Sequence, residues 1–116
     1  MRAQRCYLRR SPKQKHGKII NLGSVLGKWT LDLCLHYGAS KASVMEMTRI
    51  LAYKWSRLLI NVNCIGLGFF STEMTKVQQE NTSFNRFLIG KVPFKRFGKP
   101  EEIVGLATFL SSTAAD

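Results

Sequence analysis

Two short apolar runs and three stretches of helical spacing organise the hydrophobic pattern of this chain. The runs cover residues 18–22 and 59–65, and their largely apolar, β-branched composition predicts two buried strands. From about residue 38 to 57, apolar side chains recur at helical intervals without an intervening proline, which predicts one long helix. Its apolar positions include Ala42, Met45, Leu51 and Trp55. Residues 28–36, which include Trp29, follow neither pattern and are expected to be irregular.

Two further helices are expected after the second apolar run. Thr72 is a suitable N-cap, with Glu73 in the first turn, for a helix that extends loosely towards Leu88. Pro100 suits the first turn of the last helix, in which Glu101 and Glu102 complement the positive end of the helix dipole.

The predicted order is therefore strand, long helix, strand, helix, helix. A strand–helix–strand unit of this size is typical of a right-handed crossover between two parallel strands. Parallel sheets are buried on both faces and normally contain more than two strands. We therefore expect the chain to be a piece of a larger α/β domain, or to take its partner strands from elsewhere.

Size and charge narrow the possible roles. The 116 residues have room for one domain, and the 45% hydrophobic and 22% charged fractions are those of a folded protein. The net charge of +11 raises nucleic acid as a partner, yet seven of the eighteen basic residues lie in residues 1–18 without a recognised binding motif. Because charge alone gives only salt-sensitive, non-specific attachment, we do not expect a nucleic-acid role. That alternative predicts retention on DNA that is lost when residues 1–16 are deleted.

The cysteine, histidine and apolar content narrows the classes further. The three cysteines, Cys6, Cys34 and Cys64, form no CxxC pair. The chain has only two histidines, His16 and His36, so we expect no cluster of metal ligands. No apolar run approaches the roughly 20 residues of a membrane-spanning helix, and no signal-like apolar segment follows the basic N-terminus. A cytoplasmic protein with reduced thiols is the simplest interpretation.

Tyr37 and Lys41 are the most distinctive pair of polar residues. Four residues apart on a helix, they would share one face, where an ammonium stabilises a phenolate and makes a tyrosine a usable proton donor and acceptor. The alternative is an exposed lysine stem that lies over a tyrosine ring. Ser24 follows the first strand and Gly66-Leu67-Gly68 the second, which places both at the carboxyl edge where open α/β sheets bind ligands. A serine there is otherwise a turn residue or a helix cap.

Four ordered segments resemble the short-chain dehydrogenase/reductase family, and together they cover roughly residues 15–116. Residues 18–27 match its strand and catalytic-serine loop, and Tyr37-Gly38-Ala39-Ser40-Lys41 matches its Tyr-x-x-x-Lys motif, thirteen residues after Ser24. Residues 60–75 match the segment usually written Pro-Gly-x-x-x-Thr, and residues 92–103 match a late helix entry of the classical subfamily. In detail the motifs are similar to those of bacterial-type members that act on sugar acids, polyols or 3-oxoacyl thioesters.

The resemblance implies an NAD- or NADP-dependent oxidoreductase and a role for each matching residue. Tyr37 would exchange a proton with the substrate oxygen, Ser24 would orient that oxygen, and Lys41 would activate the tyrosine and bind the nicotinamide ribose. The cofactor would be held by Tyr37, Lys41, Gly68, Phe70 and Thr72. Outside the resemblance, the last three are a turn glycine, a core aromatic residue and a helix cap. Residues 73–90, with Phe84, Phe87 and Leu88, would form a mobile lid over a small carbonyl or alcohol substrate.

The chain also departs from the family pattern. No GxxxGxG turn, no acidic residue for the adenosine ribose and no Asn-Asn-Ala-Gly motif precede residue 15, and Leu67 stands where the family usually has proline. We therefore expect a partial Rossmann-like, doubly wound parallel sheet that lacks the nucleotide-binding half and the last strand. Residues 1–14 would be a basic leader and residues 15–116 the partial domain.

Two functional hypotheses follow from this. The chain is the catalytic half of a reductase, active within a parent protein that is expected to be a homo-oligomer but inactive alone. The alternative is a non-catalytic fragment that pairs with a full-length member of the family through its long helix, around Met45, Leu51 and Trp55.

Overall fold

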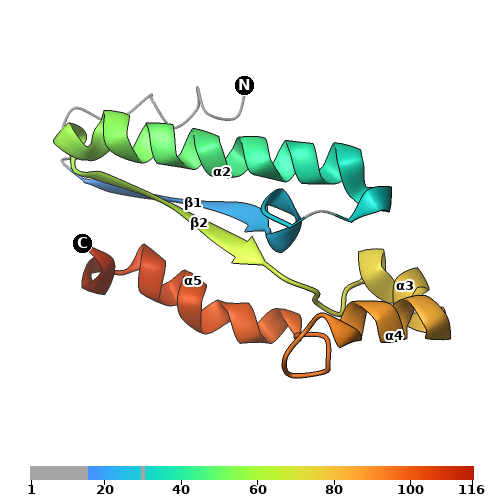
Figure 1. Cartoon of the computed structure of the whole chain (residues 1–116). Coiled ribbons are helices and arrows are strands. Elements are labelled where there is room, and N and C mark those ends of the chain that lie inside the picture. Colours follow the sequence, from blue (N-terminus) through green and yellow to red (C-terminus); the bar gives the residue numbers. More distant parts are fainter. Residues whose placement is uncertain (1–15, 30) are drawn as a thin grey trace.

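The structure, a computed structural model, describes residues 16–29 and 31–116. Its centre is a β–α–β unit formed by β1 (Gly17–Ser24), α2 (Leu35–Trp55) and β2 (Ile60–Leu67) (Figure 1). Three shorter helices follow: α3 (Lys76–Glu80), α4 (Thr82–Gly90) and α5 (Val104–Ser111). This confirms the predicted strand–helix–strand unit and the α/β class, but three helices follow β2 where two were expected. The expected basic leader, residues 1–14, lies outside the described residues.

β1 and β2 form a parallel two-stranded sheet. Their register runs from Gly17 opposite Ile60 to Ser24 opposite Leu67, so both strands reach the carboxyl edge of the sheet together. The strands are slightly longer than expected: Ser24, expected after the first strand, is the last residue of β1, and Gly66 and Leu67, expected after the second, are the last residues of β2. A glycine weakens a strand without ending it where the ladder continues, and here Gly66 lies opposite another glycine of β1.

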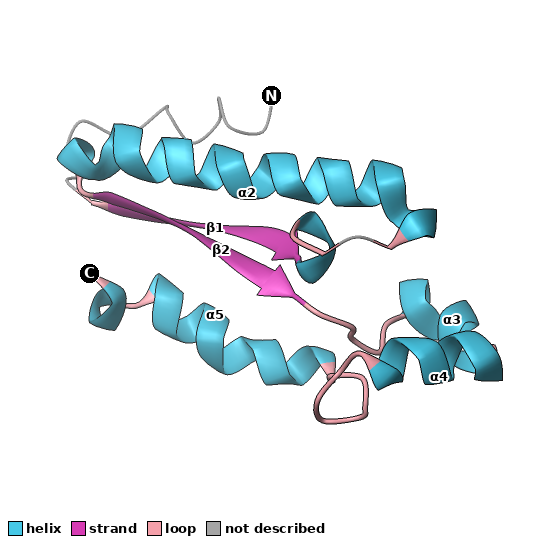
Figure 2. Cartoon of the chain, in the orientation of Figure 1, coloured by secondary structure: helices cyan, strands magenta, loops and turns pink. Residues whose placement is uncertain are grey.

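Helices cover both faces of the sheet, as Figure 2 shows, with α2 along one face and α5 along the other. The core between α2 and the sheet is built from Trp55, Ile60 and Val62. Partly buried residues that pack against it are Ile19, Leu51 and Ala52. The predicted apolar side of the long helix is therefore the side that faces the sheet, because its side chains gain most by leaving water there.

The long helix begins three residues before its expected start at residue 38. A short 3-10 turn, η2 (Asp32–Cys34), leads directly into α2 at Leu35, so part of the segment expected to be irregular is helical. At its other end the turn η3 (Ser56–Leu58) closes on Leu59, whose left-handed backbone (φ 54°) turns the chain back into β2.

The segment after β2 contains two helices where one loose helix was expected. Thr72 is the N-cap of a 3-10 turn, η4 (Glu73–Thr75), as predicted, and η4 continues into α3. The chain then breaks at Asn81, whose side-chain oxygen accepts a hydrogen bond from the Phe84 N–H (3.1 Å) and so starts α4. An asparagine favours such caps because its side chain replaces a missing backbone acceptor.

The C-terminal segment is tied to the amino ends of the strands. Its entry turn, η5 (Pro100–Ile103), starts with the predicted proline, and a last turn, η6 (Thr113–Ala115), follows α5. Lys18 of β1 forms an ion pair with Asp116, and the Asn61 side chain of β2 donates a hydrogen bond to the Ala115 carbonyl (3.0 Å). Within the described part of the chain, no helix has both the length and the apolar character needed to cross a membrane.

Candidate active site

Four segments gather at the carboxyl ends of the two strands (Figure 1). They are the turn η1 (Val25–Gly27) after β1, the start of α2, the loop after β2, and the pair α3–α4. Because β1 and β2 are parallel and end together, everything that follows them emerges at one edge.

Ser24 is the last residue of β1 and is buried, with 5% of its surface exposed. Its hydroxyl oxygen accepts a hydrogen bond from the Leu26 N–H (3.2 Å) and thereby caps η1. No other hydrogen bond of this hydroxyl is seen among the described residues, so its proton is free to be donated to a ligand. The cap explains how the turn holds the serine in one orientation.

Tyr37 and Lys41 lie at the start of α2 on one face, as their spacing predicts. The Lys41 Nζ lies 5.6 Å from the centre of the Tyr37 ring and donates a hydrogen bond to the Leu22 carbonyl of β1 (2.9 Å). Tyr37 is 41% exposed, so its hydroxyl can be reached from solution. Lys41 thus joins the helix to the strand two residues before Ser24, and the arrangement brings together the three predicted catalytic residues at one edge.

Two glycines allow η1 to lie directly against α2. A Cβ atom on Gly27 would lie 2.9 Å from the backbone nitrogen of Ala42, and one on Gly38 would lie 2.9 Å from the carbonyl oxygen of Leu26. Both distances are below ordinary van der Waals contact, and backbone atoms move less easily than side chains. The sequence gives Gly38 no role beyond its place in the Tyr-x-x-x-Lys motif. In the structure it allows the serine turn to pack against the helix.

The loop after β2 holds the predicted cofactor-binding residues. Gly68 is exposed, and a Cβ atom there would meet nothing within 4 Å, so its backbone is open to a ligand. Phe70 forms an isolated parallel bridge with Gly98, in which the Ser71 N–H donates to the Gly98 carbonyl (2.8 Å). Thr72 is exposed next to this bridge, where it caps η4.

An ion pair that was not predicted from the sequence stabilises the turn around Gly98, the residue that pairs with this loop. The two terminal guanidinium nitrogens of Arg96, Nη1 and Nη2, donate hydrogen bonds to the Glu102 carboxylate (2.9 and 2.6 Å), which also accepts one from the Lys99 N–H (2.6 Å). The hydrogen bonds from Arg96 are the main reason that the pKa of Glu102 falls to about 2. The pair fixes the turn that carries Gly98 to the start of α5, and no short-range sequence rule links an arginine to a glutamate six residues later.

A cavity of about 540 Å³ lies beside η1 and η2, within the size range of small-molecule sites. Leu26, two residues after Ser24, and Cys34, three residues before Tyr37, contribute to its wall. The aromatic residues that line it are Trp29, Phe69, Phe84 and Phe87. Two residues of the predicted lid, Phe84 and Phe87, therefore face a cavity, whereas the third, Leu88, is buried at 4% exposure. Trp29 was not predicted to be a site residue. Its position in the sequence between Ser24 and Tyr37 could have indicated that it lies near the site.

The residues present fit the nicotinamide end of a dinucleotide. A second cavity, of about 370 Å³, is lined in part by Val25, Gly68 and Phe70, so the open backbone of the glycine faces space beside the serine turn. It adjoins the first cavity, with which it shares Trp29, Phe69 and Lys91. The loop after β1, in contrast, holds a single glycine, Gly27, and is not a glycine-rich phosphate turn. In the described ranges, no three histidine, cysteine or acidic side chains are grouped as metal ligands would be. Cys34 and Cys64 are free thiols, and Cys6 lies outside the described residues.

Comparison with known proteins agrees with these features. A family model described as enoyl-(acyl carrier protein) reductase matches residues 2–116. The chain is 40% identical over 104 residues to the 5-keto-D-gluconate 5-reductase of Escherichia coli, an alignment that covers 90% of this chain and 41% of that protein. It is 34% identical over 103 residues to the 3-oxoacyl-(acyl-carrier-protein) reductase MabA of Mycobacterium tuberculosis, covering 89% of this chain and 41% of the relative.

Solved structures show the same likeness. The crystal structure of a gluconate 5-dehydrogenase from Burkholderia cenocepacia, in complex with NADP and tartrate, superposes with a TM-score of 0.85 at 31% identity. The match covers 97% of this chain and 42% of that structure. The chain thus spans about two fifths of the length of these relatives. The fold is a partial Rossmann-like one, and the chain belongs to the short-chain dehydrogenase/reductase family.

Proposed function

We propose that the chain carries the proton-transfer part of an NAD(P)-dependent oxidoreductase that interconverts a carbonyl group and a secondary alcohol. The observation that supports this most strongly is the grouping of Ser24, Tyr37 and Lys41 at the carboxyl edge of a parallel sheet. Membership of the family and the NADP-bound relative support the same chemistry.

Each side chain has a separate task in the proposed reaction. The buried Ser24 hydroxyl would donate a hydrogen bond to the substrate oxygen and hold it in place. Tyr37 would exchange a proton with that oxygen, and the ammonium of Lys41 would stabilise the phenolate formed in the process. When bound, the nicotinamide cofactor supplies or accepts the hydride.

The same face would hold the nicotinamide end of the cofactor. Lys41 would bind its ribose with the donors not used on the Leu22 carbonyl. The open backbone at Gly68 would allow close approach, and Phe70 and Thr72 would contact the carboxamide and the neighbouring phosphate. The bridge between Phe70 and Gly98 supports this arrangement because it fixes the loop from which both residues extend.

The substrate would be a small carbonyl compound or a secondary alcohol. The family resemblance offers sugar acids, polyols and 3-oxoacyl compounds as candidate classes, and the printed names of the relatives include a sugar acid reductase and a 3-oxoacyl reductase. We also propose a cytoplasmic location, where nicotinamide cofactors are available. Alone, the chain is expected to turn over little or no substrate, because its sequence contains no glycine-rich turn for the cofactor phosphates.

A chimera tests this proposal. Residues 16–116 would replace the matching C-terminal segment of the Escherichia coli 5-keto-D-gluconate 5-reductase, so that the relative supplies the nucleotide-binding part. Oxidation of NADPH and NADH would be followed by absorbance with 5-keto-D-gluconate and a panel of ketones. The proposal predicts turnover by the chimera and almost none by the isolated chain. A folded chimera that binds cofactor but reduces none of the panel would contradict it.

A second candidate function is non-catalytic pairing with a full-length member of the family. The favouring observation lies on the side of α2 that faces away from the sheet, where Leu35, Ile50 and Tyr53 are 73%, 55% and 87% exposed. The expectation that Met45, Leu51 and Trp55 form such a contact is wrong: Trp55 and Leu51 pack in the core. Met45 lies against the backbone of β1 and η1. Large apolar side chains exposed along one helix face are typical of a protein–protein contact.

A further inference from the structure

We propose that the 540 Å³ cavity beside η1 selects an uncharged, apolar carbonyl compound. On this proposal the oxidoreductase acts on a ketone or secondary alcohol with a ring or branched hydrocarbon group, rather than on a sugar acid or a polyol. The reaction itself rests on the proposed function, whereas the choice of substrate rests on the lining of the cavity.

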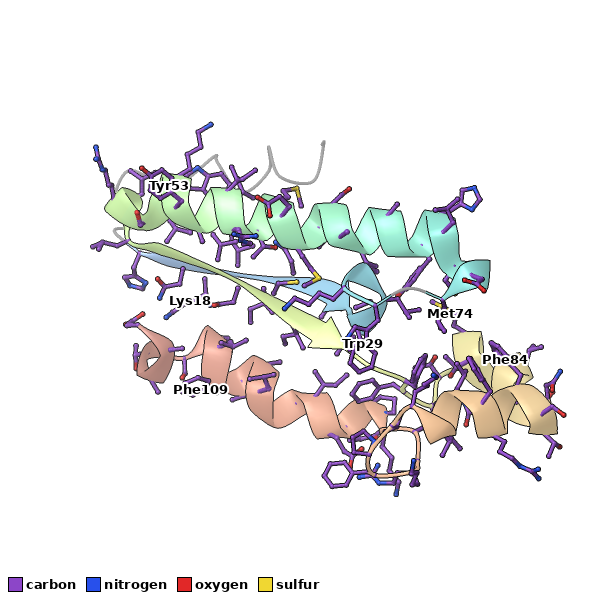
Figure 3. All side chains as sticks on the ribbon, in the orientation of Figure 1. Lys18, Trp29, Tyr53, Met74, Phe84 and Phe109 are labelled. Atoms are coloured by element: carbon purple, nitrogen blue, oxygen red, sulfur yellow. The ribbon has the colours of Figure 1, made fainter. Side chains whose placement is uncertain are left out.

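The described lining is mainly apolar, and its four aromatic residues come from three segments of the chain. Trp29 follows η1, Phe69 follows β2, and Phe84 and Phe87 lie on α4. Figure 3 shows Trp29 beside the carboxyl ends of the strands and Phe84 on the side of α3 and α4. The Phe84 and Phe87 rings are nearly parallel, with centres 6.3 Å apart. Trp29 and Phe87 are still 59% and 48% exposed, so an apolar ligand would cover hydrophobic surface that now meets water.

The polar groups around the cavity are few and cancel in charge. Asp32 and Lys91 are the only charged residues in its described lining, and the Lys91 Nζ lies 5.4 Å from the centre of the Phe87 ring. No hydroxyl or amide side chain is found among the described lining residues. A polyol placed there would lose hydrogen bonds to water without replacing them, and a carboxylate would meet one charge of each sign.

The position of the cavity joins it to the proposed chemistry. Leu26 and Cys34 of its wall belong to the two segments that carry Ser24 and Tyr37. A carbonyl oxygen directed to those residues would leave the rest of the molecule among the aromatic rings. Such a site orients its ligand through apolar contact and a single polar point, a common design of small-molecule pockets.

Ligand binding to the full 116-residue chain tests the proposal without cofactor. The three probes are 4-phenyl-2-butanone, its ring-carboxylated analogue 4-(3-oxobutyl)benzoate, and 5-keto-D-gluconate, measured by saturation-transfer NMR and titration. We expect the dissociation constant of the neutral ketone to be at least about tenfold below that of 5-keto-D-gluconate, and the analogue to bind more weakly than the ketone.

Variants assign the binding to this cavity. Trp29→Ala and Phe84→Ala are each expected to weaken 4-phenyl-2-butanone at least about fivefold, because each removes an aromatic face, and Phe84 does not line the second cavity. Tyr53→Ala, which removes an exposed aromatic residue from the outer side of α2, is the matched control and should leave the dissociation constant of the ketone unchanged (Figure 3). Far-UV circular dichroism of each variant checks that the fold is kept, and Trp29→Gln offers a polar replacement that should reduce the preference for the ketone.

Three results would overturn the substrate class: tighter or equal binding of 5-keto-D-gluconate, no binding of the neutral ketone, or equal effects of Trp29→Ala and Tyr53→Ala. Failure of the proposed function has a different signature. In that case the chimera would not transfer hydride to any ketone, while the cofactor-free preference of the chain for 4-phenyl-2-butanone would persist.

Discussion

At the scale of single residues, the site depends on contacts that hold three side chains at the edge of the sheet. The hydrogen bond from Lys41 to the Leu22 carbonyl joins α2 to β1. The cap from Ser24 to the Leu26 N–H shapes the turn between them. Gly27 lets that turn approach the helix backbone. The proposed chemistry therefore relies on backbone geometry as much as on the reactive groups.

The close approach at Gly27 predicts a destabilising effect of one added methyl group. Gly27→Ala should lower the free energy of unfolding by about 1–3 kcal/mol, because the new Cβ atom would press on the backbone of Ala42. Gly105→Ala is the control, since nothing lies within 4 Å of that position in α5, and it should be neutral or stabilising. Urea titrations followed by circular dichroism measure both. Equal stability of Gly27→Ala and the parent would show that the turn does not need the glycine.

The ion pair between Arg96 and Glu102 predicts a dependence of stability on pH. The pKa of Glu102 is lowered from 4.5 to about 2 by its hydrogen bonds from Arg96 and the Lys99 N–H. The charged form is therefore favoured in the folded state, and its contribution is complete above about pH 4.5 and lost as the pH falls to about 2. The difference in the free energy of unfolding between the parent and Glu102→Gln should therefore become smaller as the pH falls from about 4.5 to about 2.

Urea midpoints from pH 2 to pH 7 measure this difference, and Glu101→Gln, which alters the neighbouring exposed acid, is the control. A difference that stays constant with pH would mean that the carboxylate of Glu102 does not stabilise the turn.

At the scale of elements, the small core between α2 and the sheet carries the fold. Ile60→Val should lower the free energy of unfolding by about 0.5–1.5 kcal/mol, because Ile60 is only 6% exposed in contact with the core. The same substitution at Ile50, which is 55% exposed on the outer side of α2, should change it by less than about 0.5 kcal/mol. Chemical denaturation compares the pair. Equal losses of stability for Ile60→Val and Ile50→Val would mean that Ile60 is not part of the stabilising core.

The sequence predicted those features of the fold and site that depend on local spacing. Both strands, the long helix and the capping by Thr72 follow from residue patterns within a few positions. The placement of Tyr37 beside Lys41 follows from the helical repeat alone. The order strand–helix–strand predicts two parallel strands, and this was sufficient to place Ser24 and the glycine loop at one edge of the sheet.

Features that depend on contacts between distant residues could not be predicted in this way. The parallel bridge from Phe70 to Gly98 joins two loops, and the ion pair from Arg96 to Glu102 spans a turn. The aromatic cavity requires Trp29 and Phe84, 55 positions apart in the sequence, to share one space. The break between α3 and α4, in contrast, had a local signal, because the Asn81 side chain is a good helix cap.

At the scale of the whole molecule, the exposed apolar side of α2 predicts self-association or association with a relative. Tyr53→Lys should reduce the apparent mass in sedimentation experiments at high concentration, because Tyr53 is 87% exposed one helical turn from the exposed Ile50. Thr108→Lys, the same added charge at an exposed polar position of α5, is the control and should leave the mass unchanged. A chain that is monomeric at all concentrations and does not co-purify with a full-length relative would exclude the pairing role.

Proton transfer by Tyr37 in a carbonyl reduction is tested by comparing the reaction rate with and without its hydroxyl group. In the chimera that carries residues 16–116, kcat for ketone reduction should fall at least about 100-fold on Tyr37→Phe, because the variant keeps the ring and loses only the hydroxyl. Tyr53→Phe on the same helix should have no effect. Equal kcat values for the chimera and its Tyr37→Phe variant would contradict the account.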